Sequence, residues 1–326
     1  MSKISPLEWE VRASAPSQAF LLGEHAVLYG SPALAISLDR RAYVEASKLT
    51  GGNLIIESEI GTHRERDGEV LESNEELSKL AEGLKELLRK YGVESGVHLR
   101  VRSEVPVSSG MASSACVAAA ISKAVDGLFN LDLSTSELLE AVYTFERIIH
   151  GRASKTGPAC AVLGGIIWVE WRDGEMVASS LGYREVPLAL ACTGEPSRTR
   201  EMVQEVSKMR QAFPYIHGRI VEAIADIVRR GREALERGDL RTLGSLMNVD
   251  QGLLYSLGVS SWPIERIVWE ARMRGALGAK LSGAGGGGCV VILHEDPEEI
   301  AKSLVSAKLS FPARVSRKGA VITVPR

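Results

Sequence analysis

The sequence predicts an α+β fold in two domains. The chain has 326 residues, which is enough for two domains with buried cores. Its first half begins with short stretches rich in apolar and β-branched residues, which are typical of strands. After residue 192 the character changes, because a long charged segment with helical spacing begins at residue 198. We therefore expect an N-terminal domain of residues 1–180 and a C-terminal domain of residues 181–326.

Individual elements follow from the spacing of apolar residues. Five leucines between Leu77 and Leu88 recur at helical spacing with charges between them, which predicts an amphipathic helix. Residues 61–67 are charged and predict a loop. Phe213 and Pro214 interrupt a helical segment that runs over residues 198–237. The predicted strands are 9–14, 19–23, 33–47, 53–58, 97–101, 164–171, 186–192, 290–293 and 313–315, and the predicted helices are 75–91, 115–129, 135–150, 198–237, 242–256, 263–274 and 298–307.

Composition argues against several classes of function. Lys plus Arg (39) nearly balances Asp plus Glu (41), so the net charge gives no reason to expect a nucleic-acid partner. Glu8, Glu10 and Arg12 interrupt the apolar residues at the N-terminus, which argues against a signal peptide. No apolar run approaches the roughly 20 residues that span a bilayer. We expect a cytoplasmic protein with no membrane partner.

The four cysteines show no spacing typical of a metal site. Cys116, Cys160, Cys192 and Cys289 each lie in an apolar or small-residue run, and none forms a CxxC pair. The sequence leaves disulfides open but favours buried free thiols.

Three segments rich in small residues suggest a phosphate site. They cover residues 15–30 (APSQAFLLGEHAVLYG), 104–116 (EVPVSSGMASSAC) and 280–289 (KLSGAGGGGC). Without large side chains, backbone N–H groups can close around phosphate oxygens. Each segment alone is weak evidence, since serine-rich turns usually cap helices and glycines often form ordinary turns.

The second and third segments supply the candidate nucleotide-binding residues. The serine-rich loop lies between a predicted strand and a predicted helix, where free N–H groups and the positive helix end favour an anion. The hydroxyl of Ser114 is a suitable hard ligand for Mg²⁺. Five glycines between residues 283 and 288 exceed what a simple turn needs. The ATP-binding candidates are Ser108, Ser109, Gly110, Met111, Ala112, Ser113, Ser114, Gly283, Ala284, Gly285 and Gly286.

In this order and at these distances, the three segments resemble the GHMP small-molecule kinases, and GEHAVLYG resembles their mevalonate kinase branch. The resemblance covers nearly the whole chain. It implies a two-domain fold, with an N-terminal domain like ribosomal protein S5 and a ferredoxin-like C-terminal domain. ATP and Mg²⁺ would bind in the cleft between them. The implied partner is a small molecule, mevalonate or a close derivative, and a homodimer is left open.

The resemblance also assigns roles that the residues alone do not. Glu24 and His25 occupy the acceptor-substrate position, whereas by themselves they read equally well as a polar turn. Glu146, in the ERxxHG segment, would be the carboxylate ligand of Mg²⁺ beside Ser114, although its spacing alone suggests a solvated charge. Thr199 lies where these kinases have a threonine near the substrate. We expect His150 to be structural.

Two positions depart from the family pattern. The usual active-site lysine is replaced by Gln18, and an ungapped alignment of the flanking HG and GG pairs places Gly157 where the family has an aspartate. Because the two charges would offset each other, their joint loss leaves no unpaired buried ion.

Several interpretations of these departures remain open. In the first interpretation, the enzyme transfers phosphate without a side-chain base at Gly157, since a loose transition state depends mainly on positioning and electrostatics. Alternatively, Lys155 takes over part of the electrostatic role, or the site serves a different mevalonate derivative through 3-hydroxyl or phosphomevalonate chemistry. A faint likeness of residues 156–168 to the diphosphomevalonate decarboxylases is outweighed by the complete glycine segment. The remaining alternative is an ATP-binding paralogue without catalysis.

Overall fold

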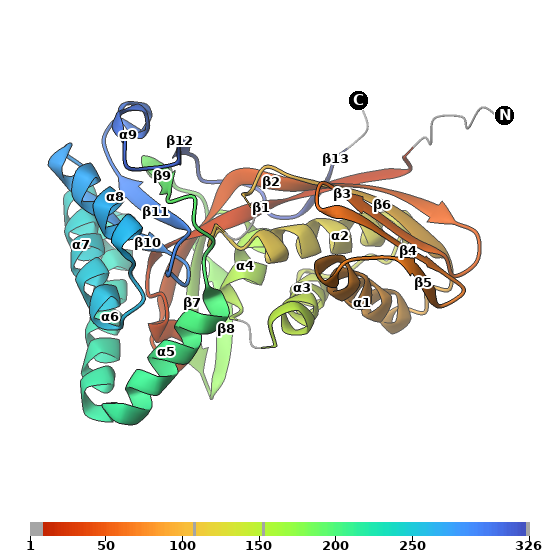
Figure 1. The fold of residues 1–326 in the computed structure, drawn as a ribbon, viewed down its shortest axis with the longest axis horizontal. Coiled ribbons are helices and arrows are strands. Elements are labelled where there is room, and N and C mark those ends of the chain that lie inside the picture. Colours follow the sequence, from red (N-terminus) through yellow and green to blue (C-terminus); the bar gives the residue numbers. More distant parts are fainter. Residues whose placement is uncertain (1–8, 107–108, 152–153, 324–326) are drawn as a thin grey trace.

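The computed structural model describes residues 9–106, 109–151 and 154–323. Two β-sheets organise this part of the chain (Figure 1). A nine-stranded sheet belongs mainly to the N-terminal half, and a four-stranded sheet belongs to the C-terminal half. The α+β class predicted from the sequence is confirmed.

The long antiparallel pair β1 (Val11–Leu22) and β2 (Ala33–Leu49) is the backbone of the first sheet. Their register shifts between Pro16 and Ser17, directly before Gln18, and such an irregularity re-aims the side chains that follow. The sheet runs in the order β13-β1-β2-β6-β3-β4-β5, with β7 pairing with β2 and β8 with β7. The remaining strands are β3 (Leu54–Ser58), β4 (Gly61–Arg66), β5 (Glu69–Glu72), β6 (Gly96–Ser103), β7 (Ile166–Arg172), β8 (Glu175–Ser180) and β13 (Val321–Thr323).

Helices α1 (Glu75–Lys90), α2 (Ser113–Phe129) and α3 (Thr135–His150) lie on one side of this sheet (Figure 1). Asn74 caps α1 by accepting from Leu77 N, and Ser134 forms a capping box with Glu137 at α3. The apolar face of α1 is buried, as its leucine spacing predicts. A further helix, α4 (Thr156–Leu163), is buried between α2 and β1.

The C-terminal sheet is antiparallel in the order β10-β11-β9-β12. Its strands are β9 (Leu188–Cys192), β10 (Gly278–Ser282), β11 (Cys289–Leu293) and β12 (Leu309–Ala313). Pro214 ends the first part of the charged helical segment and begins the second. The helices are α5 (Thr199–Ala212), α6 (Pro214–Arg237), α7 (Leu240–Ser256), α8 (Trp262–Met273) and α9 (Pro297–Ser303), of which α7 and α8 contact β10.

The end of the chain returns to the first sheet. Val315 bridges to Leu38, and β13 pairs antiparallel with β1. The predicted division at residues 180 and 181 stays a prediction, while β13 physically ties the C-terminal end to the N-terminal sheet. No helix in the described residues is both long enough and apolar enough to cross a membrane.

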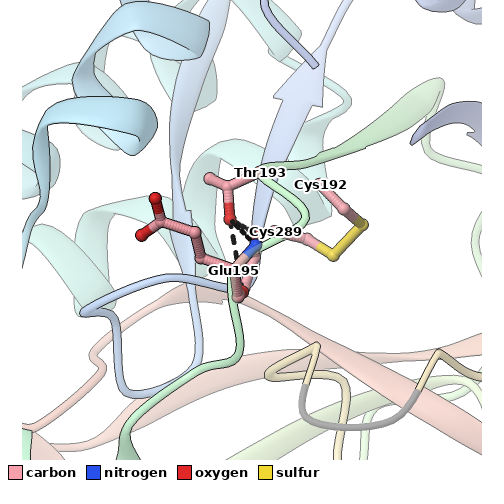
Figure 2. Close-up of a disulfide and its surroundings, with 5 residues drawn as sticks. Cys192, Thr193, Glu195 and Cys289 are labelled. Atoms are coloured by element: carbon pink, nitrogen blue, oxygen red, sulfur yellow. Dashed lines mark hydrogen bonds between the residues drawn. A yellow bond between two sulfur atoms is a disulfide. The ribbon is translucent and has the colours of Figure 1, made fainter. Parts of the chain in front are cut away.

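Two expectations from the sequence are wrong. Residues 61–66 form strand β4, in which buried His63 and Glu65 alternate with exposed side chains and which pairs with β3 in a hairpin. Cys192 and Cys289 are not free thiols: they form a disulfide between neighbouring strands β9 and β11 (Figure 2). Cys116 and Cys160 are buried and free, as expected.

Candidate active site

The fold brings the three small-residue segments together. Gln18 N, on β1, donates to Met111 O at 3.1 Å, which joins the first segment to the second. A Cβ on Gly110 would lie 2.6 Å from Ser282 O, and one on Gly283 would lie 2.7 Å from Gly110 O. Both positions therefore need glycine, because the backbones of the second and third segments touch.

The serine-rich loop ends at the start of α2, as predicted for an anion site. Ala112, the N-cap residue, has a φ of +52° and offers no side-chain acceptor to the first turn. Such a helix start presents N–H groups without side-chain competition. Ser109 and Met111 are buried, while Ser113 and Ser114 are partly exposed. Ser108 lies outside the described residues.

The glycine segment is held by a second loop, residues 193–198. Thr193 N donates to Gly288 O at 2.9 Å, and Ser197 Oγ donates to Gly285 O at 3.2 Å. The Cys192–Cys289 disulfide joins the strands at the base of both loops (Figure 2). Gly283 to Gly286, the predicted phosphate-binding part, therefore has a fixed base, with Gly283 and Ala284 partly exposed.

Glu146 and Ser114, the two residues predicted to bind Mg²⁺, lie close together in the structure. Glu146 is 8% exposed on α3, and burial raises its pKa to about 7, opposed by a hydrogen bond with Ser114. His150 Nε2 is 3.1 Å from Ser114 Oγ and 3.9 Å from Glu146 Oε1. Ser114 and Glu146 are thus neighbours, as predicted, and His150 belongs to the same cluster.

Residues 23–25 connect β1 to a short 3-10 helix (Ala26–Tyr29), and we call them the acceptor turn after the role expected for Glu24 and His25. Glu24 and His25 are 1% and 5% exposed, so the fold places both inside the junction of the two halves. His25 has a φ of 58°, which is unusual for a residue with a side chain and is common at functional sites. Its Nε2 is 2.9 Å from Ala284 O, so the acceptor turn contacts the glycine segment directly.

Two charged residues beside Glu24 were missed by sequence analysis. Lys280 Nζ, on β10, donates to Glu24 Oε1 and lies 3.6 Å from Asp250 Oδ2 on α7. Burial raises the pKa of Glu24 to about 7, while the Lys280 ammonium opposes the rise. The pKa of Asp250 is raised for the same reason. A signal was present, since both residues interrupt apolar segments.

The raised pKa of Glu24 predicts a pH dependence of stability. Between the ordinary value of 4.5 and about 7, the folded protein binds more protons at Glu24 than the unfolded chain. The free energy of unfolding should therefore fall as pH rises through this window, by about 1–3 kcal/mol in total. Urea unfolding of wild type and Glu24→Gln between pH 4.5 and 8 measures this contribution as their difference. A difference that stays constant with pH would contradict it.

Gln18 and Gly157, the two positions that depart from the family pattern, lie near the serine-rich loop and the start of α2. Gln18 is 6% exposed and reaches the serine-rich loop through its backbone. Gly157 is buried in the first turn of α4, where a Cβ would lie 3.2 Å from Ala115 Cβ and 3.3 Å from Ala112 Cβ. Lys155 precedes α4, and its Nζ lies 5.7 Å from the centroid of the Tyr143 ring. No ion pair of Lys155 occurs within the described residues.

Thr199 is exposed at the first residue of α5. The preceding residue, Arg198, donates its N–H to Gly285 O at 3.3 Å. Thr199 is thus one residue from a direct contact with the glycine segment, and its assignment near the acceptor stays a prediction.

The donor set fits a nucleotide with a metal ion. Several buried polar atoms at this junction have no hydrogen-bond partner among the described residues: Ser17 Oγ, Gln18 Oε1, Glu24 Oε2, His25 Nδ1, Ser109 Oγ, Glu146 Oε1 and Asp250 Oδ1. Buried polar groups normally have partners, so such a concentration marks a place where ligand or water atoms complete the bonding. Carboxylate and hydroxyl oxygens are the ligands that Mg²⁺ prefers.

Known families match both halves of the chain. The GHMP kinases N terminal domain matches residues 78–165, and the GHMP kinases C terminal domain matches residues 232–309. The mevalonate kinase of Thermococcus sibiricus is 32% identical over 95% of this chain and 97% of its own length. That of Aeropyrum pernix is 34% identical over 95% of this chain and 97% of its own length.

Solved structures agree in fold. L. major mevalonate kinase in complex with R-mevalonate has a TM-score of 0.81 and 27% identity, and the match covers 98% of this chain and all of that chain. Methanococcus jannaschii mevalonate kinase has a TM-score of 0.78 and 25% identity, with 95% of this chain and 99% of that chain covered. The chain therefore belongs to the mevalonate kinase family of the GHMP kinases and is an ATP-dependent kinase.

Proposed function

We propose that this kinase transfers the γ-phosphoryl group of ATP to the primary hydroxyl of mevalonate. The observation that supports this most strongly is the convergence of three elements at one junction: the start of α2, the glycine segment and the acceptor turn. A primary oxygen reaches an in-line position with less steric hindrance than the tertiary 3-hydroxyl, so we favour it as the acceptor.

Each element has a separate task in this proposal. The N–H groups at the start of α2 and of residues 283–286 surround the phosphates. Ser114 and Glu146 hold Mg²⁺, which supplies neutralisation of phosphate charge when bound. The acceptor turn, with His25 and Glu24, orients the acceptor. Thr199, beside the glycine segment, contacts the acceptor from the C-terminal half.

Transfer proceeds without a carboxylate base at residue 157. Gly157 packs tightly against α2, since a Cβ there would lie 3.2 Å from Ala115 Cβ and 3.3 Å from Ala112 Cβ. Positioning and charge stabilisation supply most of the catalysis in phosphoryl transfer. Gln18 and Lys155 are the polar groups that flank the transferred group in this proposal.

Substitution of Gly157 tests the base-free site. Gly157→Ala should change stability by at most about 1 kcal/mol, because the tight contact with Ala115 and Ala112 opposes the helix preference of alanine. Gly157→Asp should lower turnover more than Gly157→Ala does, because it adds an unpaired buried carboxylate. Thermal unfolding and steady-state turnover of both variants separate the packing effect from the charge effect. A strong rise in turnover for Gly157→Asp would show that the site is a degraded copy of an Asp-dependent kinase.

A substrate screen tests the acceptor assignment. ATP consumption is measured with mevalonate, its 3- and 5-phosphates, homoserine and galactose at equal concentrations. We expect the highest kcat/KM for mevalonate. Turnover of a mevalonate phosphate in preference to mevalonate would support the alternative of phosphomevalonate chemistry. Mg·ATP binding without turnover of any acceptor would instead favour a non-catalytic paralogue, and homodimer formation stays a separate prediction.

A further inference from the structure

Three charged side chains meet, fully buried, where the two halves of the protein join. Lys280 is 0% exposed, Asp250 is 0% exposed and Glu24 is 1% exposed. The ammonium of Lys280 contacts both carboxylates and also donates to Leu281 O at 2.8 Å. One positive charge thus faces two negative groups that come from different elements: the acceptor turn and α7.

Stability alone does not account for this cluster. Removing charges from water is costly, and apolar residues of similar size are often equally stable or more stable than a buried ion cluster. Glu24 Oε2 and Asp250 Oδ1 also lack partners within the described part of the chain. The cluster therefore carries both an energetic cost and free acceptor atoms beside the acceptor turn.

The cluster is continuous with the two parts of the active site. Asp250 Oδ2 accepts from Gly23 N at 3.4 Å, so Asp250 contacts the acceptor turn through its backbone as well as through Lys280. Lys280 lies on β10, three residues before Gly283, where the glycine segment begins. His25 contacts the glycine segment itself at Ala284 O, so the acceptor turn is joined to β10 through Lys280 and to the glycine segment through Ala284.

We propose that Lys280, together with Asp250, is a positioning residue that holds the Glu24 carboxylate at the acceptor and fixes the acceptor turn against the glycine segment. The inference rests on the proposed function, because it assigns these residues to binding of the mevalonate-type acceptor. The ammonium orients Oε1 of Glu24, which leaves Oε2 to accept a hydrogen bond from an acceptor hydroxyl. Asp250 holds the ammonium and the Gly23 backbone from the opposite side.

Replacement of Lys280 tests this role. In Lys280→Met, two buried carboxylates lose the only cation that pairs with them in the described part of the chain, so Glu24 takes up a proton and its orientation is lost. The Kd of mevalonate should rise about tenfold or more, while the Kd of Mg·ADP should change less than about threefold. Calorimetry measures both. Lys302→Met, which removes an exposed lysine on α9, is the matched control. If Lys280→Met does not fold, Asp250→Asn carries the test through its pH profile.

Asp250→Asn gives a readout that a purely structural role would not change. The groups that face Glu24 are Lys280 on β10, Asp250 on α7 and the adjacent His25. The amide keeps an acceptor for Gly23 N but removes the neighbouring negative charge, so Glu24 should ionise at lower pH. The pH profile of mevalonate binding should therefore move about one unit toward lower pH relative to wild type.

The outcomes separate the two claims. Lower unfolding temperatures in Lys280→Met and Asp250→Asn, with unchanged mevalonate Kd and pH profile, would overturn the positioning role and leave the proposed function intact. Failure of the wild-type protein to bind mevalonate would overturn the proposed function and this inference with it. A selective loss of mevalonate binding together with the displaced profile supports the proposal.

Discussion

Glu146→Gln should lower kcat by about two to three orders of magnitude. The substitution keeps the size of a side chain that is 8% exposed beside Ser114, so packing is preserved while the proposed carboxylate ligand of the metal is removed. Charge neutralisation on the transferred phosphate weakens, and the chemical step slows. Turnover measured over a range of Mg²⁺ concentrations checks this, because part of the loss should be recovered at high Mg²⁺.

Glu140→Gln is the matched control for this prediction. Glu140 is exposed on the same helix, α3, and its substitution should leave kcat within about twofold. If Glu146→Gln retained wild-type turnover and wild-type dependence on Mg²⁺, the assignment of Glu146 as a metal ligand would be wrong.

Loss of the Cys192–Cys289 disulfide should lower the free energy of unfolding by about 4 kcal/mol. The bond joins residues 97 positions apart, so it restricts a long stretch of the unfolded chain. Chemical unfolding of Cys192→Ser/Cys289→Ser against wild type under non-reducing conditions measures the difference.

Dithiothreitol supplies the internal control for the disulfide. Once unfolding exposes the bond, the reductant should destabilise wild type to the level of the double variant and leave the variant unchanged. Cys116 and Cys160 are buried thiols in both proteins, so they do not account for a difference. Equal unfolding curves for oxidised wild type and the double variant would contradict a stabilising disulfide.

Sequence patterns predicted the elements whose apolar periodicity is strong. The leucines of α1 and the break at Pro214 each act within one or two helical turns, so they are visible without tertiary information. The disulfide was missed because strand register, not local sequence, brings Cys192 opposite Cys289. Strand β4 was missed because it is short and its exposed positions carry charged side chains, so it lacks the apolar content typical of a strand.

Part of the candidate site could likewise be predicted from local sequence, and part becomes visible only in the folded structure. The glycine-rich and serine-rich loops predict that the backbone approaches a ligand or a facing loop closely. The contact of Gly110 with residues 282–283 confirms a close approach between the two loops. Lys280 and Asp250 gave no motif, because each becomes significant only when β10 and α7 pack beside Glu24. Gly157 was interpreted as a lost charge, whereas the structure adds a packing factor: a Cβ at residue 157 would contact Ala112 and Ala115 on the α2 side at 3.2–3.3 Å.

The product of the reaction with mevalonate tests the central claim most directly. Enzyme, Mg·ATP and mevalonate are incubated to completion, and the product is examined by proton-coupled phosphorus NMR. Phosphorylation of the primary hydroxyl places the phosphorus next to a CH₂ group, which gives a triplet, together with one equivalent of ADP. A singlet from a tertiary phosphate would contradict the primary-hydroxyl assignment, and ADP with only inorganic phosphate, or no ADP at all, would contradict phosphoryl transfer to mevalonate.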